Sequence, residues 1–351
     1  MRPLALAVLL LAAAPAAADA RHDANAGVEA ANAGKLDDAI AFFTAAIASD
    51  ELHGPDLATV HYDRADAWKR KGDPAKALAD ADQALKLAPD YGDALRLRGN
   101  LRLEQGDTAG ALADLDKALK AQPGDAAALV SHALANLAAG RGDAAIAELS
   151  EAIRLKPDYA AAYADRANAY VAARRYAPAA EDFTALLKLR PGDAQARKGR
   201  ADAYARLGKT DLAKADYDAL LQADPADAGL YRRQADADLA AQAYDKAAAE
   251  YTKALALKPD DAAALLNRGA AYHSLKQYAK AIEDYSAAIK LAPGDPRAYN
   301  NRGNAYAAMS RFDQAVADYD AALALQPSYE EARHNREGAL KARDTGRAIR
   351  G

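Results

Sequence analysis

The side chains best suited to bind another molecule are asparagines that recur at fixed spacings. One series, with a 34-residue period, consists of Asn267, Asn301 and Asn335. A second series lies one helical turn further along and contains Asn100, Asn168 and Asn304. Asparagine is a mediocre helix former, so its repeated use on one helical face needs a reason. A carboxamide both donates and accepts hydrogen bonds, which suits the backbone of an extended peptide. We predict that these six residues bind a peptide; the alternative is a polar, solvated groove without such a ligand.

A second pattern couples arginine to aspartate at a separation of sixteen residues. It is followed by Arg64–Asp80, Arg98–Asp114, Arg166–Asp182, Arg200–Asp216, Arg268–Asp284 and Arg302–Asp318. Where His132 or Gln234 replaces the arginine, Glu148 or Glu250 replaces the aspartate. Because the two positions change together, we predict bidentate ion pairs that join paired helices. These arginines are then structural residues rather than ligand contacts. The alternative is two independent, solvated positions.

Catalytic and metal-binding chemistry has little support in the composition. The 351 residues include no Cys, and the 6 His never fall at a metal-ligand spacing. No G-x-S-x-G, H-E-x-x-H or phosphate-binding glycine loop is present. The formal net charge of -4 offers no basic field for nucleic acid or an anionic membrane. We expect no enzyme, no cofactor and no metal. The alternative, an enzyme with an unrecognised site, would need a deep pocket with perturbed carboxylates.

Prolines mark the elements that must position these side chains. They recur with the same 34-residue period, at Pro89, Pro123, Pro157, Pro191, Pro225, Pro259, Pro293 and Pro327. Small and bulky residues share this period, as expected where two helices pack closely and a large side chain fills the space beside them. Each period is predicted to form a helix–turn–helix. In one of them the helices cover residues 262–275 and 278–291, and Pro293 prevents continuation. The predicted fold class is all-α.

One of these units carries the motif of a known family. It resembles the tetratricopeptide repeat through Tyr299, Arg302, Gly303, Tyr306, Ala315, Tyr319 and Pro327. The resemblance implies a right-handed superhelical solenoid of nine helix pairs over residues 21–329. It also implies a capping helix over 330–343, and we expect a disordered tail over 344–351. The concave surface would be lined by the first helix of each pair. The tetratricopeptide domain of the O-linked N-acetylglucosamine transferases uses an asparagine ladder, and this likeness extends to Asn267, Asn301 and Asn335.

The same resemblance implies a role in protein interaction. We predict a non-catalytic scaffold or adaptor that binds an extended peptide or a partner protein in the concave groove. The alternative is an architectural subunit of a cell-envelope or polysaccharide-export assembly that uses the convex face or the ends. Chaperone-binding members of the family clamp the carboxylates of a C-terminal peptide, and Arg232, Arg233, Lys198 and Asn267 imitate that clamp. Their spacing matches poorly and favours a mixed-charge, solvated face.

The N-terminus resembles a secretory signal. Arg2 precedes an apolar run of about 15 residues, and Ala18-Asp19-Ala20 provides an A-x-A cleavage site. We expect residues 1–20 to be removed after Ala20, and the mature chain to be periplasmic or secreted without insertion into the membrane. A retained anchor is the alternative. It is disfavoured because the run is short, because Pro15 interrupts it, and because charged residues begin at Arg21.

Overall fold

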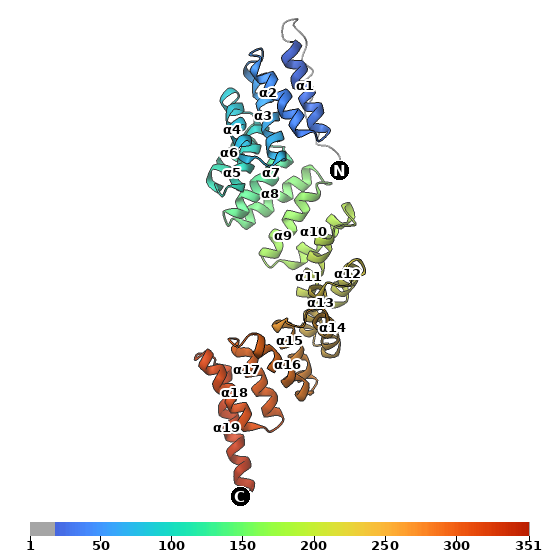
Figure 1. The fold of residues 1–351 in the computed structure, drawn as a ribbon, viewed down its shortest axis with the longest axis vertical. Coiled ribbons are helices and arrows are strands. Elements are labelled where there is room, and N and C mark those ends of the chain that lie inside the picture. Colours follow the sequence, from blue (N-terminus) through green and yellow to red (C-terminus); the bar gives the residue numbers. More distant parts are fainter. Residues whose placement is uncertain (1–17, 351) are drawn as a thin grey trace. The chain divides into compact units, whose positions relative to one another are not determined.

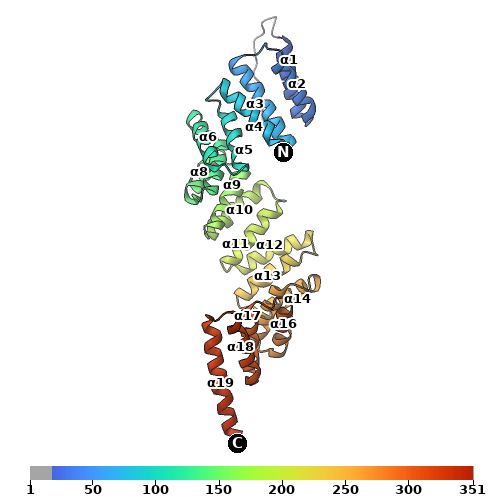
Figure 2. The same cartoon turned by 60° about the vertical axis from the view of Figure 1, so that its left-hand side comes forward.

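The computed structural model describes residues 18–350 and is helical throughout, with no strand in this range. The chain divides into two compact units, one ending at Ala173 and the other beginning at Arg174. Figures 1 and 2 show that helices within each unit stack in chain order, each packed against its neighbours in the sequence. The predicted all-α class, the helix-pair solenoid and the C-terminal helix are therefore confirmed.

The first unit contains nine of these helices. They are α1 Ala18–Asn32, α2 Leu36–Ala48, α3 Gly54–Lys71, α4 Pro74–Leu87, α5 Gly92–Glu104, α6 Thr108–Ala121, α7 Ala126–Ala138, α8 Gly142–Leu155 and α9 Ala160–Ala172. The predicted signal peptide lies outside the described residues up to position 17, and α1 begins at Ala18.

The second unit contains the remaining ten. They are α10 Tyr176–Leu189, α11 Ala194–Arg206, α12 Thr210–Ala223, α13 Ala228–Ala240, α14 Tyr244–Leu257, α15 Ala262–Ser274, α16 Tyr278–Leu291, α17 Pro296–Ala308, α18 Phe312–Leu325 and α19 Glu330–Arg350. The bounds of α15 and α16 match the predicted pair to within one residue.

Helix boundaries follow from local chemistry that recurs from repeat to repeat. Several odd-numbered helices begin after an aspartate whose carboxylate accepts from a backbone N–H two or three residues ahead: Asp125, Asp193, Asp227, Asp261 and Asp295. The turn inside a pair needs a left-handed residue. Glycine supplies it at Gly72, with a φ of 87°. Lys276 and Ser310 adopt the same conformation, both at a φ of 59°, without that freedom.

Close approach of the two helices of a pair explains the small residues. A Cβ added to Gly303 would lie 2.7 Å from Cε1 of Tyr319, and one added to Gly269 would lie 2.7 Å from Cε1 of Tyr285. Both tyrosines are almost completely buried. The glycine and the aromatic ring therefore occupy one space that a larger first residue would overfill.

Successive odd-numbered helices contact one another within each unit, for example α13 with α15 and α15 with α17. Among the described helices, no two successive even-numbered helices of a unit pack as closely. The odd-numbered helices therefore form the tighter, inner layer of each unit, and the even-numbered helices form the outer layer.

The last helix is longer than expected. We predicted a helix over 330–343 and a disordered tail over 344–351, but α19 continues to Arg350. Its N-terminal half packs Ala339 and Leu340 against Val316 and Tyr319 of α18, as a capping helix should. The extension follows from the absence of a stop signal, since residues 344–350 contain no proline.

Candidate peptide-binding surface

The arginine–aspartate pairs form the predicted bidentate bonds in most repeats. In the last pair, Arg302 Nε donates to Oδ2 of Asp318 and Nη2 donates to Oδ1, both at 2.7 Å. Four further pairs show the same geometry: Arg64–Asp80, Arg98–Asp114, Arg200–Asp216 and Arg268–Asp284. The remaining Nη1 reaches the preceding repeat, as in the 2.9 Å bond from Arg302 to Ser286. Each of these arginines therefore joins two helices of its own repeat to the repeat before it.

These pairs are substantially buried on the carboxylate side. Asp318 is 7% exposed, and hydrogen bonding to Asp318 raises the pKa of Arg302. At Asp80, burial acts to raise the pKa, but hydrogen bonds from His61 and Arg64 outweigh it and lower the pKa below its usual value. Both partners are held in the charged form. The arginines are thus committed to packing and are not available to a ligand.

The two variant pairs behave differently from each other. His132 Nδ1 lies 2.9 Å from Oε1 of Glu148, so that substitution preserves the contact. Gln234 does not contact Glu250 as we expected: its Nε2 donates to Oδ1 of Asp218 at 3.4 Å instead. Gln234 Oε1 and Glu250 Oε2 are both buried without a hydrogen-bond partner. The amide donor of Gln234 is directed to Asp218, which leaves only its acceptor oxygen unpaired, and Glu250 instead forms an ion pair with Lys253, whose Nζ lies 3.1 Å from Oε2.

The asparagines of the second unit lie in its inner layer, but most are already engaged. Asn267 Nδ2 donates to Oδ1 of Asp236, and Asn335 Nδ2 donates to Oδ1 of Asn304, both at 3.1 Å. Asn301 makes no hydrogen bond to the described part of the chain, although it is only half-exposed. All four residues, Asn267, Asn301, Asn304 and Asn335, are partly buried between neighbouring odd-numbered helices. Three of them, Asn267, Asn304 and Asn335, form hydrogen bonds within the protein.

Buried tyrosine hydroxyls complete this arrangement, and sequence analysis missed them. Tyr251 donates to Oδ1 of Asp236 at 2.5 Å, and Tyr319 donates to Oδ1 of Asn304 at 2.7 Å. Each tyrosine stands fifteen residues after its acceptor, and this spacing was the signal that could have revealed the contact. We call the series of such contacts the tyrosine ladder. It ties each even-numbered helix that takes part to the inner layer.

The two remaining predicted residues belong to the first unit. Asn168 on α9 is exposed and Asn100 on α5 is half-buried; neither forms a hydrogen bond with the described residues. The positions fifteen residues after them hold Leu115 and Phe183, which have no hydroxyl. Within the described residues of the first unit, both carboxamides are therefore left unpaired.

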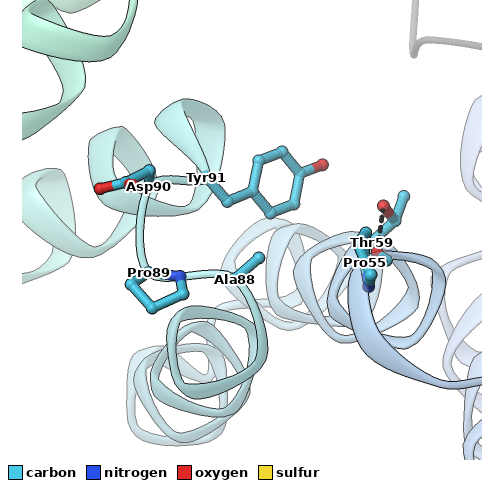
Figure 3. Close-up of a pocket in the computed structure, with 6 residues that line it drawn as sticks. All are labelled: Pro55, Thr59, Ala88, Pro89, Asp90 and Tyr91. Carbon is cyan, nitrogen blue, oxygen red and sulfur yellow. Dashed lines mark hydrogen bonds between the residues drawn. The ribbon is translucent and has the colours of Figure 1, made fainter.

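The first unit also contains an open pocket of about 450 Å³, lined by Pro55, Thr59, Ala88, Pro89, Asp90 and Tyr91. Figure 3 shows the Tyr91 ring pointing from the loop before α5 toward Thr59 and Pro55 at the start of α3. The rings of Tyr91 and Tyr62 lie 5.2 Å apart. Nearby Asp63 is 9% exposed, and burial, together with the charges of Asp66 and Asp93, raises its pKa to about 7.

No group of three or more His, Asp or Glu side chains in the described residues could hold a metal ion. Among the described helices, none is both long and apolar enough to cross a membrane.

Comparison with known families agrees with this geometry. Sequence profiles described as "TPR repeat" or "Tetratricopeptide repeat" match residues 58–91, 96–160, 164–228, 235–276, 271–310 and 296–329. The chain belongs to the tetratricopeptide repeat family. Tetratricopeptide repeat proteins generally act as scaffolds for protein interaction. No curated protein sequence matches the chain significantly.

Solved structures resemble the chain only loosely. The TPR domain of P58(IPK) is 22% identical, with 93% of this chain and 99% of that chain covered and a TM-score of 0.34. Yeast Tom70 is 15% identical, with 93% of this chain and 96% of that chain covered and a TM-score of 0.43. MamA is 24% identical over 49% of this chain and 94% of its own, with a TM-score of 0.44. Likenesses at this level carry no argument about a partner.

Proposed function

We propose that this tetratricopeptide repeat protein is a non-catalytic scaffold that holds an extended peptide, or an extended segment of a partner protein, along the inner layer of its second unit. The supporting observation is the line of partly exposed carboxamides and carboxylates on α13, α15, α17 and α19. Such groups bond to a peptide backbone without reading its side chains, so they suit a partner of varied sequence. Each net hydrogen bond contributes only about 0.5–1.5 kcal/mol, so several must act together.

A second candidate, an architectural subunit of an envelope or polysaccharide-export assembly, has its own supporting observation. Several even-numbered helices end in a leucine that is 37–46% exposed: Leu87, Leu155, Leu189, Leu257, Leu291 and Leu325. They occupy equivalent positions of the 34-residue period, so in each unit they recur at the same place in the outer layer. Repeated apolar side chains at one place favour contact with another protein.

One experiment separates these two candidates. The inner variant replaces Asn267, Asn301 and Asn335 together by Ala, and the outer variant replaces Leu257, Leu291 and Leu325 together by Gln. Partners captured by the wild type from the native envelope fraction are identified by mass spectrometry, and binding of the main partner is then measured for both variants. Loss in the inner variant alone supports the scaffold. Loss in the outer variant alone supports the architectural subunit. Circular dichroism checks that both variants keep their helical content.

We also propose that the protein is exported. The proposal rests on the signal-like pattern of residues 1–20, and cleavage after Ala20 would leave the ion pair between Arg21 and Asp56, at 3.7 Å, intact. Expression of the full chain in a bacterium should yield periplasmic or secreted protein whose N-terminal residue is Arg21, as read by intact mass and N-terminal sequencing. Recovery of uncleaved chain from the membrane would instead support the retained anchor.

A further inference from the structure

The tyrosine ladder is built from rungs that each unite three residues of neighbouring repeats. A tyrosine hydroxyl from the even-numbered helix donates to an acceptor on the odd-numbered helix of the same repeat. A donor from the next odd-numbered helix reaches the same acceptor. Three rungs are complete: Tyr217–Asp202–Arg233, Tyr251–Asp236–Asn267 and Tyr319–Asn304–Asn335. Their hydroxyl-to-acceptor distances are 2.6, 2.5 and 2.7 Å.

A fourth rung has both donors and lacks the acceptor. Its tyrosine is Tyr285 on α16 and its asparagine is Asn301 on α17, but the acceptor position on α15 holds Ala270. Neither the Tyr285 hydroxyl nor the Asn301 carboxamide has a hydrogen-bond partner among the described residues. Tyr285 as a whole is only 2% exposed, but its hydroxyl is not one of the fully buried polar atoms without a partner, so a group from outside can reach it. We call these three residues the open rung.

A small apolar pocket of about 200 Å³ lies at the same junction between repeats. Its lining comprises Ala262, Ala263, Leu266, Ala288, Ala292, Asp295, Arg297 and Ala298. Each member of the open rung stands one helical turn from a lining residue: Ala270 from Leu266, Tyr285 from Ala288, and Asn301 from Ala298. One turn advances a helix by about 5 Å, and an extended peptide covers that distance in about two residues. Pocket and open rung are therefore within reach of consecutive parts of one extended segment.

We infer that the open rung binds a main-chain carbonyl oxygen of an extended peptide, and that the adjoining pocket receives an aliphatic side chain of the same peptide. This inference rests on the proposed scaffold function and assigns its anchoring point. In the complete rungs the equivalent hydroxyl and carboxamide both donate to one oxygen, so the group missing from the open rung is an oxygen acceptor. A neutral carbonyl oxygen fits this place. In the last complete rung the neutral side-chain carbonyl of Asn304 accepts from the same two residue types, the Tyr319 hydroxyl and the Asn335 carboxamide.

The first test needs no ligand and uses the full chain. Tyr251→Phe removes a hydrogen bond from a complete rung, whereas Tyr285→Phe removes a hydroxyl that has no partner among the described residues. Urea unfolding should therefore show a clear loss of stability for Tyr251→Phe and none for Tyr285→Phe. Ala270→Asn supplies the missing acceptor and should raise the unfolding midpoint relative to the control Ala308→Asn, at an exposed position of α17. Equal destabilisation by the two Tyr→Phe changes would overturn the open rung.

The second test uses a peptide. A phage-displayed library of random 12-residue peptides is selected on the wild-type chain, and the best binder is synthesised with a fluorescent label. Its affinity should fall at least about tenfold in Ala270→Asn, because the new carboxamide occupies the carbonyl site, and about three- to tenfold in Tyr285→Phe. Ala308→Asn should bind like the wild type. Replacing peptide carbonyls one at a time by thiocarbonyls should weaken binding at a single position, and that effect should disappear in Tyr285→Phe.

The other outcomes separate this inference from the proposed function. In one outcome, peptide binding is unchanged in Ala270→Asn and Tyr285→Phe but lost in the triple variant of Asn267, Asn301 and Asn335. That result overturns the open rung and supports the scaffold function. Binding lost only when Leu257, Leu291 and Leu325 are changed overturns both. Failure to select any peptide overturns the inference as well.

Discussion

Arg268 illustrates how one residue can hold three helices together. It forms two bonds of 2.8 and 2.7 Å to Asp284 and a third of 3.1 Å to Thr252 of the preceding repeat. The carboxylate is buried and the guanidinium is partly exposed, so the pair differs from an ordinary surface ion pair. Removing one partner should therefore lower the free energy of unfolding by more than it does in an exposed pair.

The first prediction is that Arg268→Met destabilises the protein strongly. Removing the guanidinium leaves Asp284 buried without its main partner, which costs about 2–4 kcal/mol in the free energy of unfolding. The measurement is urea unfolding followed by circular dichroism. Arg154→Met is the control, because its ion pair with Glu151 is exposed, and it should leave the midpoint unchanged. A change in Arg268→Met as small as in the control would show that the pair is solvated.

The second prediction concerns pH and Asp63. Burial first, and then the charges of Asp66 and Asp93, raise its folded-state pKa from 3.8 to about 7. Between these two values the folded state binds more protons than the unfolded state, so stability should fall as the pH rises toward 7, by at most about 1.4 kcal/mol per pH unit. Asp63→Asn should be more stable than the wild type at pH 8 and should lose this slope. Asp158→Asn, at an exposed position, is the control. An unchanged slope in Asp63→Asn would refute the assignment.

At the scale of helices, the α13–α14 pair packs closely but lacks the arginine bridge that other pairs have. Gln234 stands where other repeats have arginine, and it is 2% exposed with one unpaired oxygen. Asp238, one turn away on α13, is also buried, and burial raises its pKa. The pair therefore has buried acceptors without an arginine between its helices to satisfy them.

The third prediction follows: Gln234→Arg should stabilise the protein. The guanidinium can reach Glu250 and Asp218 as its equivalents reach their partners, and we expect a gain of about 1–3 kcal/mol. Differential scanning calorimetry should show a higher unfolding temperature. Gln234→Met, which removes the unpaired oxygen without adding charge, separates the two contributions. Destabilisation by Gln234→Arg would mean that the space cannot admit the longer side chain.

At the scale of the whole molecule, each unit is a sum of repeats that contact only their neighbours in sequence. Such a protein tolerates the loss of an internal repeat if the new neighbours fit. Residues 262–295 form one repeat, from the start of α15 to the cap of α17. Their removal would place Asp261 before Pro296, in the capping position that Asp295 holds now.

The fourth prediction is that deletion of residues 262–295 yields a folded protein of undiminished helicity per residue. Asn301 would then face Asp236, so the open rung would be replaced by a complete one. The deletion variant should unfold cooperatively, with lower total stability, and should not bind the peptide selected on the wild type. Circular dichroism and the fluorescence titration check both points. A deletion variant that still binds the peptide would place the carbonyl site elsewhere.

The sequence alone determined the period, the helix pairs and the bidentate arginine bonds. Each of these depends on residues within one 34-residue repeat, where helix geometry relates sequence spacing to distance. The sixteen-residue separation of Arg302 and Asp318 was enough to predict their contact. The 34-residue period of Asn267, Asn301 and Asn335 was likewise enough to place these residues on one layer.

Only the tertiary structure decided which of those carboxamides are occupied. Asn267 reaches Asp236, 31 positions earlier, because adjacent odd-numbered helices stack at close range, and Asn301 finds Ala270 at the corresponding place. The burial of Asp63 and the unpaired oxygen of Gln234 were equally invisible, since both depend on what neighbouring helices bring beside them. Spacing within a repeat determines which face of its helix a side chain occupies. Packing between helices determines whether the polar groups of that side chain find hydrogen-bond partners.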